Sequence, residues 1–216
     1  MPDTNINLWG SSTHALGYLA RADSIPRREE GERALLEFLP ASLDRVLDLG
    51  SGDGRLLALV RQACPQTEAV ALDFSETMLE QLRRRFEGEA LVTIVAHDLN
   101  VPLSGALGTF DVVVSSFAIH HLPHDRKRSL YAEVYRLLRP GGVFLNLEHV
   151  ASPTESLHLR FLAVLGVAPE EEDPSNKLLD VETQLSWLRA IGFVDVDCHW
   201  KWRELALLAG TRPAAA

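Results

Sequence analysis

The sequence predicts an α/β fold in which helices cover both faces of one doubly wound, mostly parallel sheet of seven strands. Three observations predict this fold. Short apolar runs alternate with helical patterns along most of the chain, which is typical of parallel sheets. The run at 110–115 is almost entirely apolar, as expected of a strand buried on both faces. The run at 46–49 leads directly into a glycine-rich turn and the start of a helix.

The first half of the chain contains three predicted strands. Residues 1–25 lack a sustained periodicity and are expected to form an irregular arm or lid, which leaves 26–216 as a single domain. Pro26 is suited to begin a helix that ends before Pro40. The predicted strands and their following helices are the strand at 46–49 with a helix from about 55, the strand at 69–72 with the helix at 75–86, and the strand at 91–96.

The second half adds four strands and a change of pattern. The strand at 110–115 precedes an amphipathic helix at 125–138, which the Arg-Pro-Gly-Gly sequence at 139–142 should end before the strand at 143–148. Residues 151–178 are expected to be an insertion that forms a lid over a ligand. A helix at 181–191 then precedes strands at 193–200 and 204–209, whose short connection allows only antiparallel pairing. The sheet should therefore carry one antiparallel edge strand.

Composition excludes several classes of protein. The 216 residues are 46% hydrophobic and 24% charged, which is ordinary for a globular domain with a substantial core. No membrane span or signal peptide is evident, so a cytoplasmic location and no membrane partner are expected. The net charge of −9 disfavours nucleic acid, whose binding needs basic surface. Cys64 and Cys198 have no paired spacing, so neither zinc nor a disulfide framework is expected.

The glycine turn predicts a ligand site. Gly50, Gly52 and Gly54 occupy alternate positions, where the backbone can bend freely and a ligand can approach it. The unpaired N–H groups of the following helix point at the same place and favour an anionic or dipolar ligand. A dinucleotide turn would need a third small residue at position 55, which is Arg55. The spacing therefore indicates a nucleotide-like ligand without a pyrophosphate.

A second signal is the acid that ends the next strand. The carboxyl ends of parallel strands meet at one crevice, where an acid at the end of the second strand contacts ribose hydroxyls. Asp73 occupies that position. The alternative is that Asp73 is only a turn residue, with Ser75 as the helix N-cap.

Five segments together resemble a known family. They are VLDLGSGDGRLL from 46, ALDFSETML from 71, AHDLN from 96, FDVVVSSFAIHHL from 110 and LLRPGGVFLNLEHV from 137. In this order they resemble the motifs of class I S-adenosylmethionine-dependent methyltransferases over roughly residues 40–150. The resemblance implies a Rossmann-like fold and S-adenosyl-L-methionine as cofactor.

The resemblance also implies roles for individual residues. Asp48 and the backbone of Gly50, Gly52 and Gly54 would hold the methionine moiety, and Asp73 the ribose. The adenine would have Phe74 and Met78 at its faces and His97, Asp98 and Leu99 at its edge. The turn that begins at Ser115 would lie near the sulfonium.

Several histidines are candidates for catalysis. A metal site at His120 and His124 is not expected, because Pro123 interrupts the helix between them and no acidic cluster completes it. Imidazole titrates near neutrality, so His120 or His149 could act as a general base. His121 is expected to pack the turn.

Candidate substrate contacts lie in three further places. In the arm, Trp9 and Tyr18 could close over the site or simply anchor the arm. Glu148 could orient a base or hold an amine, or close the strand as part of a polar pair. Near the C-terminus, Trp202 and Arg203 could form a substrate wall with an anion clamp or pack the end of the sheet. The acidic run at 170–173 would steer cations inward if it faced the site.

We therefore expect methyl transfer from S-adenosylmethionine to an oxygen or nitrogen of a small organic acceptor. Three alternatives remain at this point. Arg55 opposes a nicotinamide oxidoreductase. A protein that binds S-adenosylmethionine without catalysis is the second alternative. The third is a cofactor-modifying enzyme, because residues 180–210 are faintly similar to carboxy-S-adenosylmethionine synthase.

Overall fold

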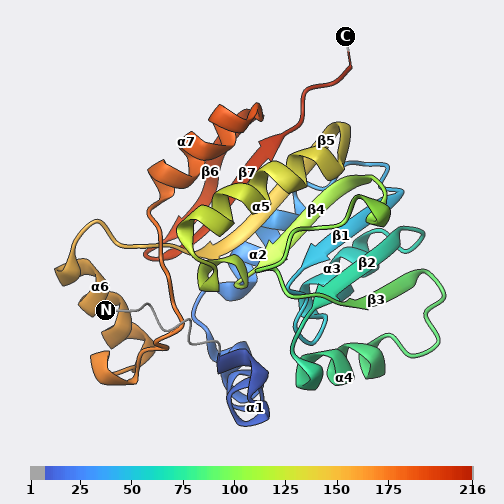
Figure 1. Ribbon diagram of the computed structural model, residues 1–216. Coiled ribbons are helices and arrows are strands. Elements are labelled where there is room, and N and C mark those ends of the chain that lie inside the picture. The colour runs from blue at the N-terminus through green and yellow to red at the C-terminus, as the bar shows by residue number, and fades with distance from the viewer. Residues whose placement is uncertain (1–7, 216) are drawn as a thin grey trace.

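The computed structural model describes residues 8–215 and contains one seven-stranded sheet (Figure 1). The strand order is β3-β2-β1-β4-β5-β7-β6. The strands are β1 (Arg45–Leu49), β2 (Glu68–Asp73), β3 (Val92–Ala96), β4 (Phe110–Ser116), β5 (Leu138–His149), β6 (Val194–Trp202) and β7 (Leu205–Thr211). The order runs in opposite directions on the two sides of β1 and β4, which opens a crevice at their carboxyl ends.

The mostly parallel sheet is confirmed. Strands β1 to β5 pair in parallel, and β7 is antiparallel to both of its neighbours. The reversed strand β7 lies between β5 and β6, so that β6 forms the edge of the sheet. A tight turn at Arg203, which has a φ of 54°, joins β6 to β7. The pairing of Trp202 with Leu205 extends β6 beyond the predicted end at residue 200.

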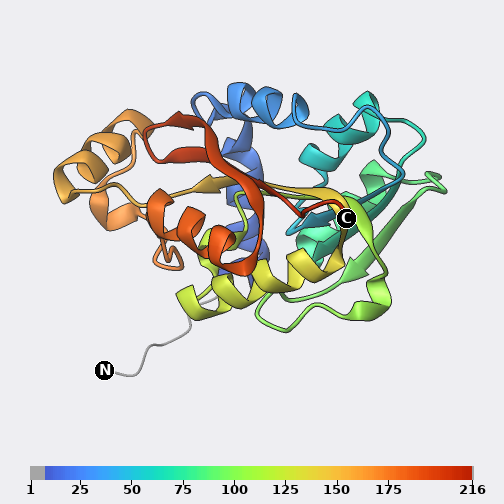
Figure 2. The same ribbon diagram turned by 90° about the horizontal axis from the view of Figure 1, so that it is seen from above.

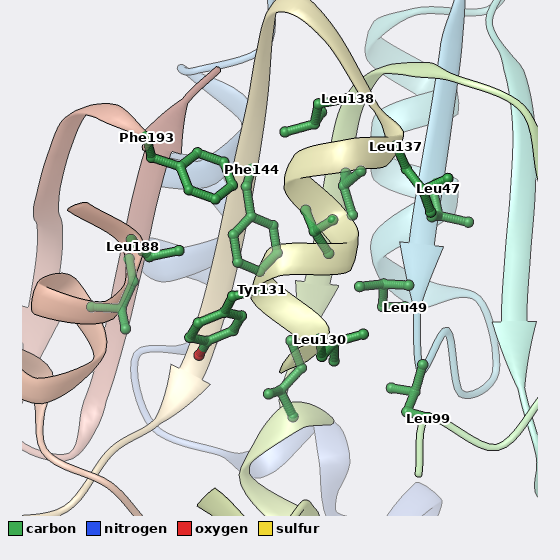
Figure 3. Packing of buried hydrophobic residues seen from close by; sticks show 14 of the residues in the cluster. Leu47, Leu49, Leu99, Leu130, Tyr131, Leu137, Leu138, Phe144, Leu188 and Phe193 are labelled. Carbon is green, nitrogen blue, oxygen red and sulfur yellow. The ribbon is translucent and has the colours of Figure 1, made fainter. Parts of the chain in front are cut away.

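Helices cover both faces of the sheet. They are α1 (Ser12–Arg21), α2 (Arg28–Leu36), α3 (Arg55–Ala63), α4 (Glu76–Arg85), α5 (His124–Leu137), α6 (Glu155–Leu165) and α7 (Val181–Ile191). Figure 2 shows α2 on one side of the sheet and α5 and α7 on the other. Apolar residues of α2, α3 and α4 form one buried cluster with their face of the sheet, and those of α5 and α7 form a second. Tyr131, Phe144 and Leu188 pack together in this second cluster (Figure 3).

Two segments differ from the sequence prediction. The Arg-Pro-Gly-Gly sequence does not interrupt β5, which begins at Leu138 and pairs with Phe110 before an irregularity in the register. The arm is not irregular, because it contains α1 between two short 3-10 helices. Ala15 is the one fully buried residue of α1, so the helix has almost no apolar stripe for the sequence to reveal. Contacts of Arg28 with Tyr18 Oη and the Ala22 carbonyl hold the arm instead.

The arm and the segment at 151–178 lie beyond the carboxyl-end edge of the sheet, as α1 and α6 show in Figure 1. Within residues 8–215, no helix combines the length and apolar character needed to cross a bilayer.

Candidate active site

A cavity lies at the carboxyl ends of β1, β2, β3 and β4. The β1–α3 turn, the β2–α4 turn and the residues after β3 and β4 form most of its wall, and Trp9, Tyr18 and Ser175 close it from the arm and the lid segment. The predicted residues on this wall are Asp48, Gly50, Gly52, Asp73, Phe74, Met78, His97, Asp98 and Leu99. Residues as far apart in the sequence as Asp48 and Leu99 thus line one cavity.

The glycine turn is tied directly to the end of β2. The Gly52 N–H donates to Asp73 Oδ2 at 2.8 Å, and the Ser51 N–H donates to the Leu72 carbonyl at 2.8 Å. Gly50 has a φ of 66°, and a Cβ there would lie 2.3 Å from the Cβ of Ala118. No other residue fits at Gly50 without a shift of the β4 loop. Gly54 has a different role, because it begins α3 and packs against Leu82 rather than lining the cavity.

Asp48 presents an unsatisfied carboxylate oxygen to the cavity. Its side chain is 1% exposed, and Oδ2 has no hydrogen-bond partner among residues 8–215. Burial, helped by the charges of Asp73 and Asp53 and opposed by a hydrogen bond with Ser51, raises the pKa of Asp48 to about 7. A buried oxygen without a donor is costly, so this position fits the cationic group of a ligand.

The surroundings of Asp73 are compatible with both roles considered from the sequence, a contact to the ligand and a turn residue. Its carboxylate lies on the cavity wall, and its Oδ1 accepts the Ser75 N–H at 2.9 Å as a turn residue would. Ser75 occupies the N-cap position of α4, although its side chain makes no capping hydrogen bond. Burial raises the pKa of Asp73, while the N–H donors of Ser75 and Gly52 oppose that shift.

The adenine end of the cavity combines apolar and polar walls. Phe74 is 36% exposed in a position to cover a flat ring, and Met78 is buried behind it. Asp98 Oδ1 already accepts the Asn100 backbone and side-chain N–H groups, both at 2.9 Å. Asn100 also lines the cavity, a position that was not predicted from the sequence.

The prediction for Ser115 is wrong in its detail. Its hydroxyl donates to the Leu49 carbonyl at 2.8 Å, and the side chain is fully buried between β1 and β4. Side chains alternate along a strand, so the next residue, Ser116, points to the cavity instead. Phe117 follows on the same wall, with a φ of 52°.

An ionic group at the start of α2 was not predicted from the sequence. Arg28 is buried, lines the cavity and donates to Glu32 Oε1 at 2.9 Å. Glu32 also accepts from Arg55 Nε at 2.7 Å and Nη2 at 3.0 Å. The spacing of Arg28 and Glu32 by one helical turn was a signal for this pair. Arg55 therefore joins α3 to α2, which explains an arginine where a dinucleotide site needs a small residue.

A second cavity adjoins the first. Trp9, Tyr18, Phe117 and His121 line both cavities. The second cavity is further lined by Arg21, Ser24, Ile25, Pro26, His120, His149, Phe161, Leu162, Leu165, Val167, Glu171, Glu172, Asp173, Asn176 and Leu205. Most of these side chains come from the arm and from residues 151–178, so the lid segment supplies one wall of this cavity.

His120 is held by Glu148 from behind. Nδ1 of His120 lies 2.6 Å from Glu148 Oε1, and Glu148 is 1% exposed and lines neither cavity within the described chain. Because the carboxylate accepts, Nδ1 carries the proton and Nε2 keeps its lone pair. Burial holds the pKa of His120 well below its usual value, with further contributions from the charges of His149 and Lys127.

His149 occupies a similar place in a different network. Its Nε2 lies 3.0 Å from Glu204 Oε2. Glu204 also contacts His158 of α6 at 3.0 Å, and His158 contacts Glu172 at 3.1 Å. These contacts fasten the lid helix to the turn between β6 and β7.

The structure contradicts the predicted wall of Trp202 and Arg203. The Arg203 guanidinium stacks on the Trp202 ring at 5.5 Å, and Trp202 packs edge-on against Phe161. Neither residue lines a cavity in the described part of the chain. Trp202, the last residue of β6, instead packs against α6 through Phe161, and Arg203 lies in the turn that follows β6.

The acidic run does reach the second cavity. Glu171, Glu172 and Asp173 line it, but Glu172 contacts His158 and Asp173 accepts from Ser175. These carboxylates are therefore engaged in holding the lid segment as well as facing the cavity.

The strand order, the glycine turn tied to an acidic residue and the two adjoining cavities define a Rossmann-like α/β fold whose first cavity suits a nucleotide-like ligand. Comparisons with known proteins narrow this class. Residues 46–142 match the model of a family described as methyltransferase domain. The demethylmenaquinone methyltransferase of Clavibacter sepedonicus is 33% identical over 193 residues, covering 81% of this chain and 76% of that protein.

Other relatives and solved structures agree with this match. The ubiquinone/menaquinone biosynthesis C-methyltransferase UbiE of Desulfotalea psychrophila is 29% identical, covering 73% of this chain and 68% of its own. An O-methyltransferase family protein from Burkholderia thailandensis has the same fold, with a TM-score of 0.75, 20% identity and coverage of 96% of this chain and 62% of that one. Human N-acetylserotonin methyltransferase, in complex with S-adenosylmethionine, has a TM-score of 0.68, 17% identity and coverage of 96% and 58%.

The chain belongs to the class I S-adenosylmethionine-dependent methyltransferases. Its cofactor is S-adenosylmethionine, in agreement with the orphaned Asp48 oxygen and the glycine cradle at Gly50.

Proposed function

We propose that the protein transfers the methyl group of S-adenosylmethionine to an oxygen or nitrogen of a small, largely apolar acceptor. The observation that carries this proposal is the pair of cavities, which share the wall of Trp9, Tyr18, Phe117 and His121. A donor in the first cavity and an acceptor in the second would meet at that wall. The aromatic side chains there also suit a sulfonium, which is attracted to aromatic faces.

The first cavity offers one charge for each end of an amino acid. Asp48 would hold the ammonium of the methionine moiety, and the buried guanidinium of Arg28 would hold its carboxylate. Asp73 would hold the ribose, and the adenine would lie between Phe74 and the residues after β3. S-adenosylmethionine supplies the electrophilic methyl group, so the main task of the chain is to align it with the acceptor.

We assign the general base to His120. Its neutral imidazole lines the acceptor cavity, and Glu148 holds it in the tautomer whose Nε2 can accept a proton. A general base contributes about 10²–10⁴-fold to a rate, whereas positioning can contribute far more. Replacement of His120 should therefore slow the enzyme without abolishing methyl transfer. His149 is the second candidate, but Glu204 already occupies its Nε2.

A carbon atom is the rival acceptor, because the relatives include proteins named as C-methyltransferases. When the acceptor carries an acidic hydroxyl, methylation at its oxygen and methylation at a ring carbon both begin with the loss of the hydroxyl proton. The experiment uses methyl-labelled S-adenosylmethionine with 1,4-dihydroxynaphthalene, which can accept a methyl group on oxygen or on a ring carbon. The carbon chemical shift of the product methyl group separates the two outcomes, and a ring methyl would overturn the proposed oxygen transfer.

The same incubation tests the two remaining alternatives. A change in the mass of the cofactor without labelled product would identify a cofactor-modifying enzyme. Of the described residues in 180–210, which carry the faint similarity to carboxy-S-adenosylmethionine synthase, Leu205 alone lines a cavity, and this disfavours that alternative. Cofactor binding without any labelled product across a panel of phenols and amines would favour a non-catalytic binding protein.

A further inference from the structure

His121 stands at the place where the two cavities meet. It lines both of them, and its Nε2 is buried without a hydrogen-bond partner in the described chain. A buried polar nitrogen that makes no hydrogen bond costs about 1–3 kcal/mol. Such an atom on a cavity wall is satisfied when a ligand supplies the missing partner.

The lid segment determines which partner His121 can take. The Ser175 hydroxyl donates to Asp173 Oδ1 at 2.7 Å, and Ser175 Oγ lies 2.9 Å from His121 Nδ1. Because the hydroxyl hydrogen is given to the carboxylate, Ser175 Oγ accepts the Nδ1–H of His121. The proton is thereby fixed on Nδ1, and Nε2 presents a lone pair to the junction.

Burial keeps the His121 ring neutral. Burial holds the pKa of His121 well below its usual value, and the neighbouring His120 adds to this shift. Asp173 and Glu148 act in the opposite direction. The other groups packed around it are His14, 3.2 Å from Asp173, and the Lys177 ammonium, which donates to the His121 carbonyl at 3.2 Å.

The cofactor has other partners for its charged groups. Asp48 and Arg28 lie on the wall of the first cavity, so the methionine moiety does not require His121. Apolar and polar side chains line the second cavity in similar numbers. Three of the polar ones, His120, His149 and Glu172, already contact Glu148, Glu204 and His158, which lie outside the cavity wall. The lone pair of His121 is therefore left for the acceptor.

We propose that His121 binds the acceptor through Nε2, which accepts a hydrogen bond from an O–H or N–H on, or next to, the atom that is methylated. Ser175 and Asp173 are positioning residues that act through His121, so the lid prepares this contact when it lies over the site. The inference rests on the proposed function and narrows its substrate class. Acceptors carry a polar hydrogen at the reacting end, and analogues without it lose this contact.

The first test compares two probes that differ in whether their oxygens carry a hydrogen or a methyl group. The binding of 1,4-dihydroxynaphthalene and of 1,4-dimethoxynaphthalene is measured by calorimetry on protein saturated with S-adenosylhomocysteine. Wild type should bind the dihydroxy probe more tightly. Ser175→Ala and His121→Phe, each kept saturated with S-adenosylhomocysteine, should reduce that preference about tenfold, and Ser175→Thr should retain it.

Two results would overturn the inference. They are equal losses for the two probes in Ser175→Ala and a wild type that does not distinguish the probes. Saturation with S-adenosylhomocysteine, checked by calorimetry for each variant, shows that the variant is folded at the site.

A second measurement is independent of methyl transfer. Nitrogen NMR of protein labelled in its histidine rings should find His121 neutral and protonated at Nδ1, and Ser175→Ala should mix the two tautomers. An imidazolium, or a proton on Nε2, would overturn the role of His121 even if the enzyme methylates its acceptor. The expected tautomer without any methyl transfer would leave His121 as assigned and count against the proposed function alone.

Discussion

Asp73 joins the glycine turn to the ligand cavity, so we expect cofactor binding to depend strongly on it. Its carboxylate accepts the Gly52 N–H and also lines the cavity. Asp73→Ala should weaken the binding of S-adenosylhomocysteine by about 1–3 kcal/mol, the scale of a lost set of hydrogen bonds to a buried partner. Calorimetry measures the change. The exposed Glu80 of α4 provides the control, and equal affinities for Asp73→Ala and Glu80→Ala would remove Asp73 from the site.

Asp48 predicts a dependence of cofactor binding on pH. Its pKa of about 7 means that the carboxyl is largely neutral below pH 7 and ionised above it. Only the ionised form attracts the ammonium of the methionine moiety. Affinity for S-adenosylhomocysteine should therefore rise between about pH 6 and pH 8, with release of a proton on binding near neutrality.

Calorimetry in buffers of different ionisation enthalpy counts the released protons. Asp48→Asn should bind weakly at every pH and lose this dependence. A wild type whose affinity is constant from pH 6 to pH 8 would contradict the assignment of Asp48 to the ammonium.

At the scale of single residues, motif spacing predicted which residues of the β1–α3 and β2–α4 turns would line one cavity. Asp48, Gly52 and Asp73 lie next to strands whose carboxyl ends must meet, so their positions follow from the sheet. Arg28 and Ser175 reach the cavities from helices and loops outside the motifs. The spacing of Arg28 and Glu32 indicated an ion pair but not its place on the cavity wall. Those places depend on how α2 and the segment at 151–178 pack on the sheet.

Among the elements, α2 packs unusually close to the sheet. A Cβ at Gly31 would lie 2.7 Å from Leu147 and 2.9 Å from Trp200. Gly31→Ala should therefore destabilise the protein by about 1–3 kcal/mol through overpacking. A Cβ at Gly17 of α1 would meet no neighbouring atom within 4 Å, so Gly17→Ala should be neutral or stabilising. Denaturant unfolding compares the two, and equal stabilities would contradict the close packing of α2.

The lid helix α6 is fastened by a histidine between two carboxylates. Burial lowers the pKa of His158, but its hydrogen bonds to Glu204 and Glu172 outweigh this effect and raise it. A raised folded-state pKa gives stability that is complete below the unfolded value of about 6.5 and is lost as the pH rises through the folded value. Protection of the α6 amides, corrected for intrinsic exchange, should fall in that range.

Hydrogen exchange followed by mass spectrometry measures this protection. His158→Gln should remove the pH-dependent part, whereas His199→Gln on the exposed edge strand should preserve it. The same pH dependence in both variants would show that His158 does not fasten the lid.

At the scale of elements, the strands and helices with strong periodicity were predicted within a few residues. The arm was the exception, because α1 buries little apolar surface and is held by polar contacts. The extent of β5 and β6 also escaped prediction. Their ends follow from pairing with β4 and β7, and these partners lie far from them in the sequence or across a tight turn.

The whole molecule combines a rigid sheet with a cover made from two distant parts of the chain. Apolar clusters on both faces hold the sheet. The arm and the lid segment meet at Asp173, which contacts His14 of α1 and Ser175 of the lid segment. The sequence predicted that residues 151–178 form a lid, and this role stays a prediction. The sequence could not predict that the lid and the arm contact one another, because that contact joins residues about 160 apart.

This arrangement predicts where the cofactor stabilises the molecule. S-adenosylhomocysteine binds the folded state and should raise its stability according to its concentration and affinity. Since Trp9, Tyr18 and Ser175 line the cofactor cavity, slowed amide exchange should extend from the β1–α3 turn to α1 and to residues 173–177. The α7 helix lines neither cavity in the described chain, so its exchange should change little.

Asp173→Ala should reduce the protection of α1 more than that of the β1–α3 turn, because it removes the contact with His14. Protection confined to the β1–α3 turn would mean that the arm and the lid do not close on the cofactor.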